Sequence, residues 1–176
     1  MVEEGLARTI RSWIESSKKV AVLTHTNPDG DAIGSSLALA LALRKMGKDS
    51  QVVIPDGLPD FLRWLPGIEL ATTFAYKRDK AIGIIKEADL IFCLDFNDPK
   101  RLNGVGEFLK QSSAKKVLID HHQEPVDFTD IAISETERGS VGEMIYLFLK
   151  NILQSELLDK EIATCLYVAI MTDTGN

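Results

Sequence analysis

The sequence predicts a single α/β domain in which a mostly parallel β-sheet carries helices on both faces. Short apolar runs of strand length alternate along the chain with longer segments of helical pattern, which is typical of parallel sheets with helical crossovers. The 176 residues, of which 45% are hydrophobic, are enough to form one core of ordinary size. The sequence contains no internal repeat, low-complexity tract or obvious linker.

The first half of the chain contains three candidate helices and two candidate strands. Leu6, Ile10, Trp13 and Ile14 recur at helical spacing. The Ala- and Leu-rich segment that follows residue 31 has high helical propensity and stops at a glycine. We therefore expect helices at residues 3–17, 32–46 and 77–87, and strands at residues 20–23 and 51–54.

The second half continues the alternation with three strands and three helices. Ser140 and Glu143 have the spacing of a capping box, and Asp159 is a second candidate N-cap. We expect strands at residues 90–94, 116–119 and 131–134, and helices at residues 104–112, 140–153 and 159–171.

Charge and composition exclude several classes of function. A net charge of −6 leaves no broad basic surface for long double-stranded nucleic acid. We expect no membrane partner and a cytoplasmic location, because no apolar run approaches the roughly 18–20 residues of a membrane-spanning helix and the start of the chain lacks a signal-peptide pattern. Cys93 and Cys165 lie in apolar runs, which predicts buried free thiols.

Three predicted strands end in a residue that can bind a metal ion, namely His25, Asp95 and Asp120. The carboxyl ends of parallel strands meet at one edge of the sheet, so these side chains should converge. An aspartate at a strand end often only begins a turn. However, the remaining histidines of the chain, His121 and His122, follow Asp120 directly, and this gathering of all three histidines favours a functional site.

The loop after the first strand reads His25-Thr-Asn-Pro-Asp-Gly-Asp31. One imidazole and the carboxylates of Asp29 and Asp31 suit a divalent cation such as Mn²⁺, whereas a structural zinc site would need thiolates. An Asp-Gly turn with an Asp N-cap and a phosphate-binding loop remain alternatives. The loop lacks the lysine and spacing of a P-loop and the G-x-G-x-x-G of a dinucleotide fold.

Four segments, taken in order, resemble the successive motifs of the DHH phosphoesterase superfamily. They are His25-Thr-Asn-Pro-Asp-Gly-Asp-Ala-Ile-Gly-Ser35, Asp95-Phe-Asn-Asp-Pro-Lys-Arg101, Asp120-His-His122 and Thr172-Asp-Thr-Gly175. The branch that they resemble most contains oligoribonucleases that act on nanoRNA and phosphatases that act on 3′-phosphoadenosine 5′-phosphate. The resemblance implies a two-metal phosphoesterase that hydrolyses short oligoribonucleotides, 3′-phosphoadenosine 5′-phosphate or both, with nucleotides or short single-stranded RNA as partners.

The resemblance also implies which side chains hold two metal ions, either Mn²⁺ or Mg²⁺. One ion is assigned to His25 and Asp29, and the other to Asp31, His121 and Asp173, with Asp95 bridging both. Two ions held roughly 3.5–4 Å apart can activate a water molecule and stabilise charge on a phosphoryl group.

Further residues receive catalytic or substrate-binding roles by the same resemblance. Asp120 would orient neighbouring ligands, and His122 would contact a phosphate oxygen or the leaving group. Ser35 and Ser36 would donate to phosphate, with helix capping as the alternative. Arg101 would bind a substrate phosphate or, alternatively, form a structural ion pair. Phe96 departs from the small residue expected beside Asp95, which we expect to affect the fit of the substrate.

Residues 1–176 are expected to form the catalytic domain alone. Full-length relatives carry an additional C-terminal substrate-binding domain, and the chain stops directly after its fourth motif. The substrate therefore remains open, and a cyclic or linear dinucleotide phosphodiesterase is an alternative. A manganese inorganic pyrophosphatase ranks lower because its first motif characteristically differs. An inert nucleotide-binding module is a further alternative, although such relatives would be expected to lose metal ligands.

Overall fold

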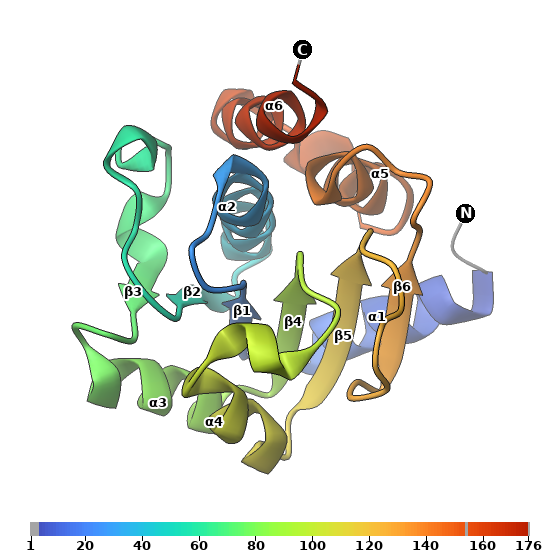
Figure 1. Cartoon of the computed structure of the whole chain (residues 1–176). Helices are drawn as coiled ribbons and strands as arrows, with labels where there is room; N and C mark the ends of the chain where they lie inside the picture. Colours follow the sequence, from blue (N-terminus) through green and yellow to red (C-terminus); the bar gives the residue numbers. More distant parts are fainter. Residues whose placement is uncertain (1–3, 154, 176) are drawn as a thin grey trace.

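The computed structural model describes residues 4–153 and 155–175, which form an α/β domain around one parallel sheet (Figure 1). The strand order is β3-β2-β1-β4-β5-β6, and every neighbouring pair is parallel. The strands are β1 (Lys19–Leu23), β2 (Asp49–Ile54), β3 (Ala71–Thr73), β4 (Leu90–Leu94), β5 (Lys115–Asp120) and β6 (Ile131–Ser134). The predicted fold class is therefore confirmed, and the short edge strand β3 is an addition to the predicted set.

Helices cover both faces of the sheet. They are α1 (Glu4–Ser16), α2 (Gly30–Lys45), α3 (Arg78–Glu87), α4 (Val105–Gln111), α5 (Val141–Asn151) and α6 (Lys160–Thr174). Figure 1 shows α2, α5 and α6 on one side and α3 and α4 on the other. The buried residues divide in the same way, because α1, α2, α5 and α6 share one core cluster while α3 and α4 share the second.

The direction of the crossovers changes between β1 and β4, and this position matters for function. The chain proceeds outward from β1 to β2 and β3 in one direction, and from β4 to β5 and β6 in the other. In such a doubly wound sheet, the loops that leave the two central strands diverge and open a crevice at their carboxyl ends. The loops that begin at His25 and Asp95 leave at this point.

Helix α2 lies between the sheet and α6, so almost all of its residues are buried. Two glycines one turn apart allow the close contact with α6. A Cβ atom at Gly34 would lie 2.5 Å from the carbonyl oxygen of Cys165, and one at Gly30 would lie 2.4 Å from the hydroxyl of Thr172. This packing brings the end of α6, which carries Asp173, to the beginning of α2.

The predicted capping residues lie where the sequence indicated. The side chains of Asp29, Ser140 and Asp159 accept hydrogen bonds from the backbone N–H groups at the starts of α2, α5 and α6. The capping box differs in its return bond, because the carboxylate of Glu143 accepts from the N–H of Gly139 at 3.3 Å.

The structure shows where three side chains that the sequence singled out lie. Cys93 and Cys165 are free and buried, as predicted. Phe96 is fully buried and stacks on Phe128 with ring centroids 5.8 Å apart, in the core cluster below the sheet. Its ring packs into the core, and the expected effect of Phe96 on the fit of the substrate stays a prediction. Among the described residues, every helix is too short or too polar to cross a membrane.

Candidate metal centre

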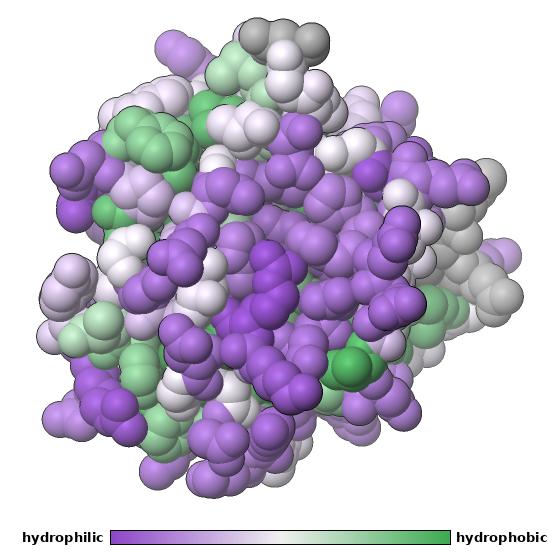
Figure 2. Space-filling view, viewed as in Figure 1, coloured by the Kyte–Doolittle hydropathy of each residue, from purple (hydrophilic) through white to green (hydrophobic). Residues whose placement is uncertain are grey.

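The six candidate ligands converge at the carboxyl edge of the sheet, although 148 residues separate the first from the last (173 − 25). They come from the ends of β1, β4 and β5, the start of α2 and the last turn of α6. Figure 2 shows a continuous hydrophilic area in the middle of the face on which these elements meet. The candidate ligands are His25, Asp29, Asp31, Asp95, His121 and Asp173.

Their donor atoms form two groups. His25, Asp29 and Asp95 each place one donor atom within 4.8 Å of the other two. Asp31, His121 and Asp173 do the same. The carboxylate of Asp95 joins the groups, because its two oxygens lie 3.3 Å from Nε2 of His25 and 3.6 Å from Nε2 of His121.

The backbone at Asp95 is left-handed, with φ of 65°. Most non-glycine residues avoid this region, and such a conformation persists only where the surrounding structure enforces it. Here the N–H of Asp95 donates to the carbonyl of Ile119 at 3.2 Å, which continues the β4–β5 ladder by one residue. The turn directs the carboxylate of Asp95 between His25 and His121. Asp95 is only 2% exposed.

Main-chain carbonyls orient the two histidine rings. Nδ1 of His25 lies 2.7 Å from the carbonyl of Thr26, and Nδ1 of His121 lies 3.2 Å from the carbonyl of Arg138. When Nδ1 donates to a carbonyl, the neutral ring keeps its lone pair on Nε2, the usual arrangement of a metal-binding histidine. Both Nε2 atoms point to the middle of the cluster, and Nε2 of His121 also lies 3.4 Å from Asp173.

His122 is arranged differently from the other two histidines. Its Nδ1 lies 2.7 Å from Oδ1 of the fully buried Asp120, and its Nε2 lies 3.0 Å from the guanidinium of Arg101. A neutral His122 donates to Asp120 and accepts from Arg101. Asp120 also accepts from the N–H of His122, so it fixes both the ring and the backbone of that residue.

Acidic groups are packed unusually close together. Burial and the neighbouring charge of Asp95 raise the pKa of Asp31 to about 8, and the same two causes raise the pKa of Asp173. Contact with the Asp95 carboxylate raises the pKa of His121 to about 9. Burial works to raise the pKa of Asp95, but His121 and His25 outweigh it and lower that pKa. A divalent cation would neutralise the repulsion between these carboxylates and would accept lone pairs from the two oriented imidazoles. The residues therefore fit such an ion.

The loop 25–31 combines two of the roles left open by the sequence. Asp29 is the N-cap of α2, accepting from the N–H of Ala32 at 2.9 Å, and it also belongs to the first group of donors. Asn27 has φ of 51°, and its N–H donates to both carboxylate oxygens of Asp56 at 2.9 and 3.0 Å. No sequence pattern marks this contact between Asp56 and the loop.

The expected phosphate contacts of Ser35 and Ser36 are corrected by the structure. Both residues are 0% exposed. Beyond its first turn, α2 is enclosed by the sheet and by α6, so neither hydroxyl is exposed to a ligand. Arg101, in contrast, lies beside His122 at the edge of the site and forms no ion pair among the described residues.

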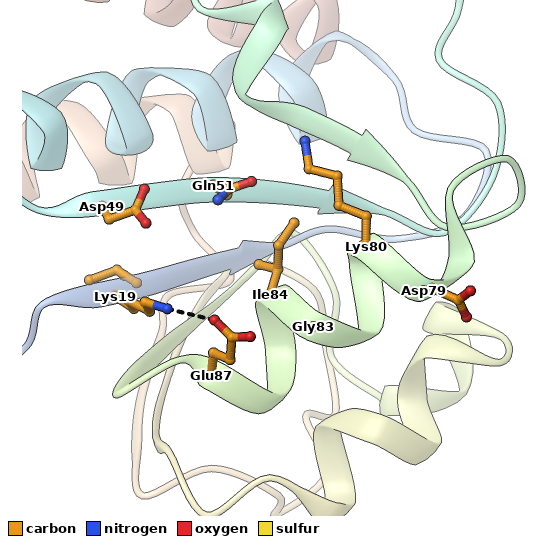
Figure 3. Close-up of a pocket in the computed structure, with 9 residues that line it drawn as sticks. Lys19, Asp49, Gln51, Asp79, Lys80, Gly83, Ile84 and Glu87 are labelled. Atoms are coloured by element: carbon orange, nitrogen blue, oxygen red, sulfur yellow. Dashed lines mark hydrogen bonds and ion pairs between the residues drawn. The ribbon is translucent and has the colours of Figure 1, made fainter.

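Two cavities lie away from the candidate ligands. One, of about 360 Å³, lies between α3 and the starts of β1 and β2, at the opposite end of these strands (Figure 3). The Lys19–Glu87 ion pair, at 2.5 Å, crosses one side of it, and its other charges are of mixed sign. The second cavity, of about 720 Å³, is mostly apolar and lies between α1, α5 and the β5–β6 edge.

The sequence matches the DHH family, N-terminal domain, over residues 19–170. The chain belongs to the DHH family. This match covers most of the chain and confirms the predicted family resemblance.

Several known proteins are similar to this DHH chain. The bifunctional oligoribonuclease and PAP phosphatase NrnA of Thermus thermophilus is 31% identical over 157 residues, covering 89% of this chain and 44% of NrnA. An exopolyphosphatase-related protein of Bacteroides fragilis superimposes with a TM-score of 0.97 at 36% identity, covering 99% of this chain and 52% of that one. RecJ of Thermus thermophilus, solved with Mn²⁺, shares the fold at a TM-score of 0.59 and 15% identity, covering 98% of this chain and 24% of RecJ. The chain thus spans about half the length of NrnA.

Proposed function

We propose that this domain is the catalytic half of a two-metal phosphoesterase that hydrolyses short oligoribonucleotides, 3′-phosphoadenosine 5′-phosphate or both. The observation that carries the proposal is the position of Asp95, whose two oxygens face one histidine from each donor group. A bridging carboxylate of this kind holds two cations at the separation used for attack on phosphate esters. Two divalent ions, Mn²⁺ or Mg²⁺, would supply the activated water and the positive charge.

The chain's own residues have distinct tasks in this proposal. His25, Asp29 and Asp95 hold one ion, and Asp31, His121, Asp173 and Asp95 hold the other. The directions of the two imidazole rings are set before any ion binds, because main-chain carbonyls already contact Nδ1 of His25 and of His121. This preorganisation lowers the cost of assembling the site.

Three residues beside the cluster are proposed to handle the phosphate. Arg101 carries a permanent positive charge and lies within 3.0 Å of His122, so both side chains can lie beside the same phosphoryl group, with the guanidinium as the donor to its oxygens. Asp120 accepts from Nδ1 of His122 and so fixes the direction of that ring, whose Nε2 lies beside Arg101. Asp120 is therefore a positioning residue for His122.

The similar proteins support the substrate class and the metal. NrnA, by its name, acts on oligoribonucleotides and PAP, and RecJ was solved with Mn²⁺. The overall charge of −6 also favours a small phosphorylated substrate over a long nucleic acid. We extend the proposal to a cytoplasmic location.

The test is hydrolysis by the purified chain with added Mn²⁺. The substrates are 3′-phosphoadenosine 5′-phosphate, RNAs of two to five nucleotides, linear and cyclic dinucleotides, and pyrophosphate. We expect turnover of the first two classes and its loss in excess chelator. Full activity in chelator would contradict a metal-dependent mechanism, and preference for cyclic dinucleotides or pyrophosphate would replace the proposed substrate by that alternative.

A further inference from the structure

The segment that leads into α5, residues 138–142, contacts two candidate ligands through its main chain. The N–H of Val141 donates to Oδ2 of Asp31 at 2.6 Å, and the N–H of Gly142 donates to Oδ1 of Asp31 at 2.7 Å. The carbonyl of Arg138 accepts from Nδ1 of His121. Asp31 and His121 belong to the donor group that Asp173 completes. His25 and Asp29 instead hydrogen-bond to the main chain of Thr26 and Ala32.

Glycine at position 142 is required by this arrangement. A Cβ atom there would lie 2.5 Å from Cβ of Ala169, 3.2 Å from the backbone nitrogen of Ile170 and 3.3 Å from Oδ1 of Asp31. The first distance is far below ordinary contact, and the neighbouring atoms belong to the α6 backbone or to a short side chain. A side chain at position 142 would therefore separate α5 from α6 or displace the Asp31 carboxylate.

Side-chain contacts fix the conformation of the segment itself. The guanidinium of Arg138 lies 2.7 Å from the carboxylates of both Glu135 and Glu143, so it ties the preceding loop to the first turn of α5. The hydroxyl of Ser140 accepts from the N–H of Glu143 at 3.1 Å. These contacts determine where the Arg138 carbonyl and the two N–H groups point.

We propose that residues 138–142, and Gly142 above all, form the positioning element of the second metal ion. This inference rests on the proposed two-metal function. Neither Asp31 oxygen can turn without losing a hydrogen bond to a buried N–H group, so the segment sets the direction of the carboxylate's remaining lone pairs. The same segment sets the tautomer of His121. Disturbing it should weaken the second ion and leave the ion at His25, Asp29 and Asp95 in place.

The experiment is Mn²⁺ titration of the whole chain, with unbound Mn²⁺ measured by electron paramagnetic resonance. We expect the unmodified chain to bind two equivalents. Gly142→Ala is combined with Ala169→Gly, which removes the closest clash and leaves the new methyl group beside Asp31. We expect this variant to bind its second equivalent about 10- to 100-fold more weakly, with the first unchanged.

Matched variants separate positioning from general damage. Ala169→Gly alone, and Gly83→Ala in α3, where a Cβ meets nothing within 4 Å, should bind both equivalents normally. Arg138→Ala should weaken binding of the second Mn²⁺ equivalent and leave the first unchanged. If the double variant does not fold, this variant tests the positioning role instead. Normal binding of the second ion by the folded variants, or equal loss of both ions, overturns this inference. Failure of the unmodified chain to bind two ions instead overturns the proposed function.

Discussion

At the scale of single residues, the strongest constraint on this site is the backbone at Asp95. The residue must have a carboxylate that reaches two histidines and a backbone that tolerates φ of 65°. Asparagine and aspartate enter the left-handed region more easily than most residues. Asp95→Asn therefore keeps the turn and removes mainly the charge, which makes it a clean test.

We expect Asp95→Asn to lower kcat by more than about 100-fold, the upper end of the effect of a supporting contact. The reason is that the asparagine amide has one neutral oxygen, whereas the proposal needs both oxygens of the anionic Asp95 carboxylate, one for each ion. Steady-state kinetics with Mn²⁺ measures the effect. Asp98→Asn, which alters the nearby cap that accepts from the N–H of Lys100, is the control and should keep normal turnover. Near-normal kcat in Asp95→Asn would refute the bridging role.

Arg101 gives a second prediction at this scale. If its charge grips the substrate phosphate, Arg101→Ala should raise KM by roughly 10- to 100-fold, as expected for loss of a hydrogen bond between charged groups, and change kcat little. Its neighbour Lys100, with a side chain 89% exposed, serves as the control, and Lys100→Ala should leave both constants unchanged. A fall in kcat at constant KM would show that Arg101 acts in the transition state instead.

At the scale of elements, the contact between α2 and α6 depends on small residues. We expect Gly34→Ala to destabilise the fold by at least about 2 kcal/mol, because its Cβ would meet the Cys165 carbonyl, and overpacking of this kind is costly. Gly83→Ala also places alanine in a helix but meets open space, so it should stabilise by about 0.5–1 kcal/mol. Urea unfolding of the two variants checks the difference. Equal stabilities would contradict the close packing described here.

The same elements show what the sequence can and cannot predict. Periodicity and capping residues located all six helices, but the last helix was expected to end at Met171 and continues to Thr174. The hydroxyls of Thr172 and Thr174 donate to carbonyls one turn earlier, and Gly175, with φ of 69°, ends the helix. The strand β3 was missed because three edge residues carry too little pattern.

Some contacts of the candidate site could not be predicted from the sequence. His25, Asp95 and His121 are marked by apolar strands that end beside them, so their convergence follows from the parallel sheet. The bonds from Val141 and Gly142 to Asp31 leave no such mark, because any residue except proline has the N–H that they use and 110 or more positions separate the partners. Burial of Ser35 and Ser36 depends equally on tertiary packing by α6.

At the scale of the whole molecule, metal binding should be linked to stability. Three carboxylates repel one another in the cluster, and a cation that binds only the folded chain relieves this repulsion. Mn²⁺ at about 100 times its Kd adds about 2.7 kcal/mol, which corresponds to a rise in Tm of roughly 5–10 °C for a chain of this size. Thermal unfolding with and without Mn²⁺ measures the shift. Asp95→Asn should show less than half of it, and an unchanged Tm in the unmodified chain would contradict a metal centre.

The position of the candidate ligands along the chain has a consequence for biosynthesis. His25, Asp29 and Asp95 precede the completion of β5, whereas the second donor group lacks Asp173 until α6 has been made. A ribosome releases the N-terminal part of a chain first. Asp95 takes its position only when Ile119 of β5 accepts its N–H, so the first donor group would be complete after β5 and the second only after α6. In the proposed two-metal mechanism, hydrolysis would therefore have to wait until α6 docks against Gly30 and Gly34 of α2.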